Sequence, residues 1–368
     1  MKRILLLVDD PMIANFYREK FQSLGLAVDA ARSGEAALHL AAEKVPDLAL
    51  IDPVLPSGSL IETVRGLRTT LGDKSILVIT GAPSPVALAV TQAGVSKILP
   101  RTERHAENVV REVQAALGLS SAPVTFSDED RESWIKTALE SAQEAVNAMR
   151  VSMHSFIKEP QNSDLLFDLF RQIHDISERM SVVGLNAVHK MTSAIEAFVY
   201  DLYSMPEQVN PSVVRTVSQS IDFLSTLLDP KYARLAQDPA TADVLVVDDE
   251  ADARKLIAKA MELVNLKITC AGEADMAMTV LTDNPFDLIF LDINLPQTNG
   301  FDICTQVRQL EDHKKTPIVF LTGLTTFQNR AKSTLSGGND FIGKPFNLLE
   351  LGVKALTWVF KERLALIQ

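Results

Sequence analysis

Part of this 368-residue chain repeats, and the repeat limits the fold more than any other sequence feature. The first repeated run ends in a pair of aspartates, the second in a single aspartate and the third in Thr-Gly. The runs recur in the same order about 240 residues apart, as 4–10 with 244–249, 48–52 with 288–292 and 76–81 with 318–323. We interpret the two ends of the chain as homologous domains.

The repeated runs predict buried parallel strands. Each is short, apolar and without alternation, which is typical of a strand covered on both faces. Amphipathic segments such as 35–42 and 251–264 lie between the runs. Strands and helices in alternation predict a doubly wound α/β domain at each end, over residues 1–118 and 243–368.

The middle of the chain differs from both ends. Residues 127–229 have almost no strand signal and little glycine. Their apolar periodicity predicts helices at 128–158, 163–182, 185–204 and 211–228. We expect an all-α domain, a four-helix bundle, between linkers at 118–126 and 229–242.

Composition excludes several classes of protein. The net charge of −11 argues against a partner that is a nucleic acid or an anionic membrane. No apolar stretch is long enough to cross a bilayer. The two cysteines, Cys270 and Cys304, cannot form a disulfide framework. We expect a cytoplasmic protein without membrane or nucleic-acid partners.

Acidic residues follow the strands of the C-terminal repeat. The carboxyl ends of parallel strands meet at one edge of a sheet, which brings Asp248, Asp249 and Asp292 together. Such carboxylates repel one another unless a hard cation lies among them, and oxygen ligands suit Mg²⁺. Thr322 and Lys344 follow later strands, and a lysine ammonium suits phosphate. The pattern predicts a magnesium-dependent site where a carboxylate accepts a phosphoryl group.

This arrangement resembles the CheY-like receiver domain of two-component response regulators. The resemblance is carried by Val-Val-Asp-Asp-Glu at 246–250, Leu-Asp-Ile-Asn-Leu-Pro at 291–296, Gly300, Leu-Thr-Gly at 321–323 and Phe-Ile-Gly-Lys-Pro-Phe at 341–346. It implies a five-stranded, flavodoxin-like parallel sheet.

The resemblance also implies a role for each matching residue. Asp292 would be the phosphoacceptor and Lys344 its positively charged partner. Asp248, Asp249, Asp292 and the backbone carbonyl of Asn294 would bind Mg²⁺. Thr322 and Phe341 would form the switch pair that reports phosphorylation.

The N-terminal repeat matches the receiver pattern only in part. The implied metal set is Asp9, Asp10, Asp52 and the carbonyl of Val54, with Asp52 as phosphoacceptor and Thr80 as the switch hydroxyl. Arg101 stands in place of the lysine and Ile98 in place of the switch aromatic. An arginine keeps the charge but not the compact ammonium geometry. Phosphorylation of Asp52 and a receiver fold kept only for docking or dimerisation both remain open.

A histidine in the second helix of the middle region lies away from that helix's apolar stripe. The stripe comprises Leu169, Ile173, Ile176, Met180 and Val183. At about 100° per residue, His174 points roughly 140° from the centre of the stripe, which predicts that it faces solvent. A neutral imidazole is a competent phosphoryl carrier.

This segment resembles histidine-phosphotransfer domains, particularly the amino-terminal domain of chemotaxis-type kinases. Gly184 and Glu196 match two family positions after the histidine, whereas Ser177 and Glu178 replace a lysine and a glycine. The resemblance implies that His174 is a phosphohistidine whose ring Glu196 orients. The alternative is a surface histidine in a bundle used only for protein contacts.

Together these patterns predict a phosphorelay signalling protein rather than an enzyme. We expect Mg²⁺ as cofactor, a histidine kinase or phosphotransfer protein as phosphodonor, and output through contact with a downstream protein. No glycine-rich nucleotide loop is present in the sequence. Homodimerisation through receiver helices or the bundle stays open. The alternative function is a non-catalytic scaffold with a degenerate receiver and a pseudo-phosphotransfer domain.

Overall fold

The structure is a computed structural model, and it describes residues 1–52, 60–80, 91–100, 105–119, 128–160, 162–235, 241–323 and 336–365. The chain forms two compact units. Unit 1 comprises residues 1–142 and 171–189, and unit 2 comprises residues 143–170 and 190–368. Within the described residues, no helix combines the length and the apolar character needed to cross a membrane.

The N-terminal domain in unit 1 is a five-stranded parallel sheet. Its strands are β1 (Arg3–Leu7), β2 (Ala27–Ala31), β3 (Leu48–Ile51), β4 (Ser75–Thr80) and β5 (Lys97–Pro100). They lie in the order β2-β1-β3-β4-β5, with Leu7 paired to both Ala31 and Ile51. The order reverses at β1, which is the switch point where open α/β sheets place their functional groups.

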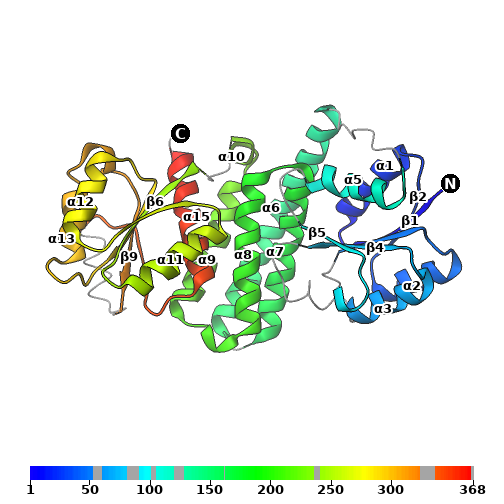
Figure 1. The fold of residues 1–368 in the computed structure, drawn as a ribbon, viewed down its shortest axis with the longest axis horizontal. Coiled ribbons are helices and arrows are strands. Elements are labelled where there is room, and N and C mark those ends of the chain that lie inside the picture. The colour runs from blue at the N-terminus through cyan, green and yellow to red at the C-terminus, as the bar shows by residue number, and fades with distance from the viewer. Residues whose placement is uncertain are drawn as a thin grey trace. The chain divides into compact units, whose positions relative to one another are not determined.

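Helices cover both faces of this sheet. One face packs against α1 (Pro11–Ser23) and α5 (His105–Ala116), and the other against α2 (Gly34–Glu43) and α3 (Leu60–Leu71). Figure 1 shows α1 and α5 on one side of the strands and α2 and α3 on the other. Alternate residues of one strand therefore enter two different cores, which explains why the strand sequences are continuously apolar.

The C-terminal domain in unit 2 has the same winding. Its strands are β6 (Asp243–Val247), β7 (Lys267–Ala271), β8 (Leu288–Asp292), β9 (Ile318–Thr322) and β10 (Asp340–Gly343), in the order β10-β9-β8-β6-β7. Its helices are α11 (Ala251–Leu263), α12 (Ala274–Asp283), α13 (Gly300–Val307) and α15 (Leu348–Ala365). Figure 1 shows α12 and α13 on one face and α11 and α15 on the other. The predicted pair of flavodoxin-like sheets is confirmed.

The middle region is helical, as predicted. Its long helices are α6 (Asp128–Lys158), α7 (Ser163–Val183), α8 (Asn186–Ser204) and α9 (Pro211–Leu227), followed by the short α10 (Pro230–Leu235). Asn210 caps α9 by accepting hydrogen bonds from the amides of Ser212 and Val213, and Pro211 occupies the first turn. Helix α10 lies where the sequence predicts only a linker. The division into domains at 127–229 stays a prediction.

Candidate functional site

The ends of two neighbouring strands bring the predicted acidic residues of the C-terminal domain together. Asp248 follows β6, and Asp292 is the last residue of β8. One carboxylate oxygen each from Asp248, Asp249 and Asp292 lies within 4.8 Å of the others. Asp248 and Asp292 are 0% and 3% exposed, whereas Asp249 faces solvent. The site is a buried acidic pocket with one open side.

Lys344 holds two of these carboxylates. It follows β10, and its Nζ lies 2.8 Å from Oδ2 of Asp292 and 2.9 Å from Oδ2 of Asp248. The ammonium thus supplies the positive charge that two buried carboxylates require. The predicted neighbourhood of lysine and aspartates is present.

The pKa values of Asp248 and Lys344 are both raised, for different physical reasons. Desolvation raises the pKa of Asp248. Hydrogen bonds with Lys344 and with the Glu250 amide lower this pKa, but by less than desolvation raises it. For Lys344, desolvation alone would lower the pKa, but hydrogen bonds and charges from Asp292 and Asp248 outweigh it and raise the pKa. Lys344 therefore stays charged at neutral pH.

Backbone geometry after β8 fixes the orientation of Asp292. Its Oδ1 accepts a hydrogen bond of 3.1 Å from the amide of Asn294. Gly300 closes the loop, and a Cβ there would lie 2.2 Å from the backbone oxygen of Asp292. Only glycine allows this approach. The role of the Asn294 carbonyl as a metal ligand stays a prediction.

The predicted switch residues flank the site. Thr322, at the end of β9, is 2% exposed, and its carbonyl accepts a hydrogen bond of 2.6 Å from the Lys344 amide. Phe341 on β10 is half-buried and packs against the apolar core beneath α12 and α13. Sequence reasoning missed Arg215 of α9, whose guanidinium carbon lies 4.1 Å from the centroid of the Phe341 ring.

The N-terminal site is arranged differently, although its strands end alike. Asp10 caps α1 by accepting from the amides of Met12 and Ile13, and its other oxygen contacts Arg179 of α7 at 2.5 Å. The Asp9 carboxylate lies 3.4 Å from Arg32. Among the described residues, Asp9, Asp10 and Asp52 do not form a three-oxygen group like that of the C-terminal domain. An arginine rather than an open cation position faces Asp10.

His174 of α7 lies against Asp52 in unit 1. Its Nε2 is 3.2 Å from Oδ1 of Asp52, and the two residues are 3% and 4% exposed. The prediction that His174 faces solvent is therefore wrong. The apolar stripe of α7 correctly indicates that His174 points away from that stripe. It does not reveal that the N-terminal receiver covers the opposite face of the helix.

Other residues of α7 share this contact with the N-terminal domain. Val182 joins the core formed by α1, α5 and the sheet. Glu178, 1% exposed, places a carboxylate oxygen within 4.8 Å of the Asp52 and His174 ligand atoms. Desolvation raises the pKa of Asp175 to about 6, with smaller effects from His174, Asp10, Arg179 and Asp52. The outer face of α7, polar except for Val182, is thus a receiver-binding surface.

Several N-terminal predictions fall on residues whose placement is not described. Val54 and Arg101 lie outside the described residues, and Thr80 ends β4 without a described side chain. Lys97 of β5 pairs with Glu112 of α5 at 2.6 Å. Glu196 is half-buried on α8, and its effect on His174 stays a prediction.

The fold and the site together define the class of domain to which the two ends of the chain belong. A parallel sheet of this strand order, with clustered aspartates and a lysine at its carboxyl edge, is a flavodoxin-like domain suited to binding phosphate and a hard cation. The family model "Response regulator receiver domain" matches residues 4–111 and 244–355, which is more than half of the chain. The chain belongs to the response regulator receiver family.

Curated relatives match one receiver-sized stretch. The transcriptional regulatory protein ResD of Bacillus subtilis is 40% identical over 115 residues, covering 31% of this chain and 47% of ResD. SrrA of Staphylococcus aureus is 36% identical over 116 residues, with the same 31% and 47% coverage. The chain thus spans about half the length of the relatives it matches.

The chain also resembles solved structures of response regulators. The chemotaxis response regulator CheY4 of Vibrio cholerae is 29% identical, covers 32% of this chain and 98% of its own, and has a TM-score of 0.31. A putative two-component system response regulator/GGDEF domain protein covers 100% of both chains at 16% identity and a TM-score of 0.37.

Proposed function

We propose that Asp292 is a magnesium-dependent phosphoacceptor in two-component signalling. The observation that carries this proposal is the contact of Lys344 Nζ with both Asp292 and Asp248 inside the buried acidic pocket. A lysine held there can neutralise the charge that develops on a transferring phosphoryl group. Membership of the receiver family supports the same assignment.

The residues present suit Mg²⁺. Asp248, Asp249 and Asp292 supply the oxygen ligands that hard cations prefer, and Asp249 leaves the pocket open to solvent. The bound ion would neutralise phosphoryl oxygens. A carboxylate oxygen of Asp292 forms the new O–P bond as the bond from phosphorus to the donor breaks. Lys344 then stabilises the phosphoryl oxygens, and Thr322 lies at the end of the neighbouring strand.

Intact-mass measurement after incubation with acetyl phosphate and Mg²⁺ tests the proposal. Wild type should gain one phosphoryl group at Asp292, and Asp292→Ala should lose that label. Asp52→Ala is the matched control, because it removes the corresponding carboxylate of the other receiver. Equal labelling of wild type and Asp292→Ala would contradict the assignment.

A second candidate function is phosphoryl exchange between His174 and Asp52. The observation that favours it is their buried pairing at 3.2 Å in unit 1. The P–N bond at the imidazole breaks as an Asp52 oxygen forms the P–O bond, and a ring protonated at its other nitrogen leaves neutral. The present separation leaves no room for a phosphoryl group, so the helix must withdraw slightly before transfer.

Trapping separates this exchange from a purely structural contact. Asp52→Ala, treated with phosphoramidate, should accumulate an acid-labile adduct on His174, because its acceptor is gone. His174→Gln in the same background is the control and should carry no such adduct. Absence of any adduct at all phosphoramidate concentrations would favour a scaffold role for the middle region.

We propose that the protein is a signalling component rather than an enzyme. Its phosphodonor would be a histidine kinase or phosphotransfer protein, and its output would be contact with a downstream protein. The charge of −11 supports protein partners over nucleic acid. Homodimerisation remains an open part of the proposal.

A further inference from the structure

Three side chains of unit 1 that can bind a metal ion meet where α7 lies on the N-terminal receiver. One ligand atom each from Asp52, His174 and Glu178 lies within 4.8 Å of the others. The three residues are 4%, 3% and 1% exposed. The acidic pocket of the C-terminal receiver offers only oxygen ligands and has an exposed carboxylate at Asp249, whereas this group includes an imidazole and is buried throughout.

The spacing of these atoms is close to that of ligands around one ion. Nε2 of His174 lies 3.2 Å from Oδ1 of Asp52. Two ligands that each bind zinc at about 2.0–2.1 Å lie about 3.3–3.4 Å apart in a tetrahedron. His174 and Glu178 are four residues apart on α7, which is the spacing at which one helix face presents two ligands to the same ion.

The elements that carry the three ligands are held in place by other contacts. The amide of Asp52 donates to the carbonyl of Leu7 at 2.9 Å, so the sheet fixes its backbone after β3. Helix α7 is anchored on the receiver by Arg179, whose Nε lies 2.5 Å from Oδ2 of Asp10, and by Val182 in the core beside α1 and α5. Ligands on rigid elements need little reorganisation when an ion binds.

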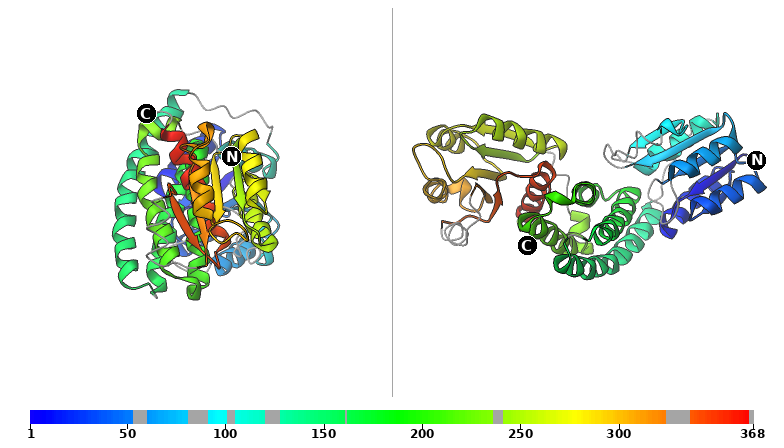
Figure 2. Two further views of the ribbon diagram at one scale, coloured as in Figure 1. Left: turned by 90° about the vertical axis from the view of Figure 1, so that its left-hand side faces the viewer. Right: turned by 90° about the horizontal axis from the view of Figure 1, so that it is seen from below.

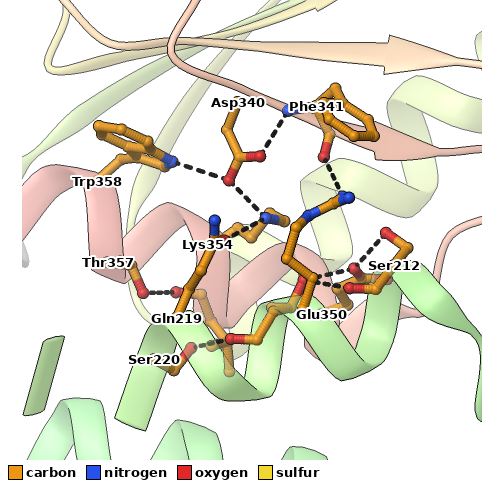
Figure 3. Close-up of polar contacts among 12 residues, drawn as sticks. Ser212, Gln219, Ser220, Asp340, Phe341, Glu350, Lys354, Thr357 and Trp358 are labelled. Carbon is orange, nitrogen blue, oxygen red and sulfur yellow. Dashed lines mark hydrogen bonds and ion pairs between the residues drawn. The ribbon is translucent and has the colours of Figure 1, made fainter. Parts of the chain in front are cut away.

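A buried carboxylate of unit 2 provides a comparison. Helix α15 packs along α9, and Figure 2 shows the red α15 beside the green α9. Glu350 of α15 is 2% exposed and accepts hydrogen bonds from the hydroxyls of Ser212 at 2.9 Å and Thr216 at 2.7 Å (Figure 3). That carboxylate faces hydroxyl donors, whereas Asp52 and Glu178 bring two carboxylates within 4.8 Å of each other. Two carboxylates this close repel each other unless a proton or a cation lies between them.

The ligand types select the class of ion. Imidazole binds Zn²⁺ and other first-row transition metals, whereas Mg²⁺ prefers oxygen ligands and keeps several of its waters. Side chains that are at most 4% exposed leave little room for those waters. Three protein ligands leave the fourth position of a tetrahedral zinc site for a water molecule or for the second oxygen of a carboxylate.

We propose that Asp52, His174 and Glu178 form a binding site for a divalent transition-metal ion, with Zn²⁺ as the best match. The ion would join the end of β3 to α7 and would offset the charge of two buried carboxylates. It would also occupy Nε2 of His174, so exchange of a phosphoryl group between His174 and Asp52 would require its release. This inference does not depend on the proposed phosphorylation of Asp292.

Titration of the metal-free full chain with Co²⁺, in excess Mg²⁺, tests the site. The chain carries Asp292→Ala, which removes a ligand of the acidic pocket, and this variant is the parent for comparison. Co²⁺ in a four-coordinate site with a nitrogen ligand gives a strong visible absorption band, and Zn²⁺ should abolish the band by displacement. The parent should bind one Co²⁺ in this way. His174→Gln and Glu178→Gln should each weaken binding by at least about 100-fold.

His39→Gln is the matched control. His39 and Glu43 are also four residues apart on one helix, 3.7 Å from each other, but both are exposed and belong to no three-ligand group among the described residues. This variant should bind Co²⁺ as the parent does. Zn²⁺ should also raise the midpoint of thermal unfolding of the parent, and should not raise that of His174→Gln.

Two outcomes overturn the proposal. One is the absence of the visible band in the parent, which would leave the contact between His174 and Asp52 as a direct hydrogen bond. The other is an unchanged Co²⁺ affinity in both His174→Gln and Glu178→Gln, which would place the ion elsewhere in the chain. Circular dichroism of each variant shows that a lost band does not reflect a lost fold.

Discussion

The two receiver domains have the same strand order, yet helices of the middle region contact them in different places. In the C-terminal receiver, α9 covers β10 and α15, and the acidic pocket keeps an exposed carboxylate at Asp249. In the N-terminal receiver, α7 lies on the acidic residues themselves, with Arg179 on Asp10 and His174 on Asp52. The same fold is therefore covered in two ways: α7 lies on the acidic residues of the N-terminal receiver, whereas Asp249 of the C-terminal receiver stays exposed.

The largest expected effect concerns the ammonium that distinguishes the two sites. Lys344→Ala should slow labelling of Asp292 by acetyl phosphate by about 100-fold, because a preorganised charge on the transferring group is lost. Lys314→Ala is the control, since that lysine is exposed and pairs only with Glu311 among the described contacts. Rates follow from intact-mass time courses. An unchanged labelling rate in Lys344→Ala would mean that the lysine ammonium does not distinguish the two receivers in their chemistry.

A smaller effect on labelling should appear when the arginine that contacts Asp10 is removed from the N-terminal site. Arg179→Ala frees the Asp10 carboxylate for Mg²⁺, so labelling of Asp52 by acetyl phosphate should rise roughly tenfold. Arg18→Ala, which alters a half-buried arginine on α1 that donates to Asn15, should leave the label unchanged. Peptide mapping assigns the label to Asp52. No increase in Arg179→Ala would show that Arg179 does not restrict this site.

The smallest effect is on stability and depends on pH. The pKa of Asp175 is raised to about 6 from 3.8, so the folded state holds a proton that the unfolded state releases between those values. The free energy of unfolding therefore falls as pH rises through this window and stays lower above it. Asp175→Asn should be more stable than wild type by about 1 kcal/mol at pH 7.5 and should lose this advantage near pH 4.

Urea denaturation followed by Trp134 fluorescence, in a Trp358→Phe background, measures this difference for unit 1. Asp168→Asn is the control, because Asp168 is an exposed carboxylate of the same helix. A stability difference that is independent of pH would mean that burial of Asp175 on the receiver is not the cause.

The sequence alone predicted both sheets, because buried parallel strands leave continuous apolar runs and the repeat doubles the signal. It also placed Asp248, Asp292 and Lys344 at one edge, since each lies at the end of a strand or directly after it. The four long helices begin and end within one residue of the predicted positions. These features depend on local periodicity and on the geometry of the sheet, both of which a single sequence records.

Contacts between helices and receivers were not predictable in the same way. The periodicity of α7 indicates where its apolar stripe points but not what covers the other face, so the exposure predicted for His174 was wrong and Arg179 was missed. One signal was available: α15 is apolar on most sides, which indicates a second neighbour. The hydroxyls of Ser212 and Thr216, four residues apart on α9, marked the side that meets it.

Lys344 has one more consequence, for the behaviour of the protein in chelating buffer. Its ammonium already contacts two of the three carboxylates in the pocket and offsets one negative charge, so the C-terminal receiver carries its own counter-ion. Withdrawal of divalent salt should leave the folded domain intact, because the lysine screens the repulsion that would otherwise strain the ends of β6 and β8. We therefore expect chelation of Mg²⁺ to prevent the proposed phosphorylation of Asp292 without unfolding the domain.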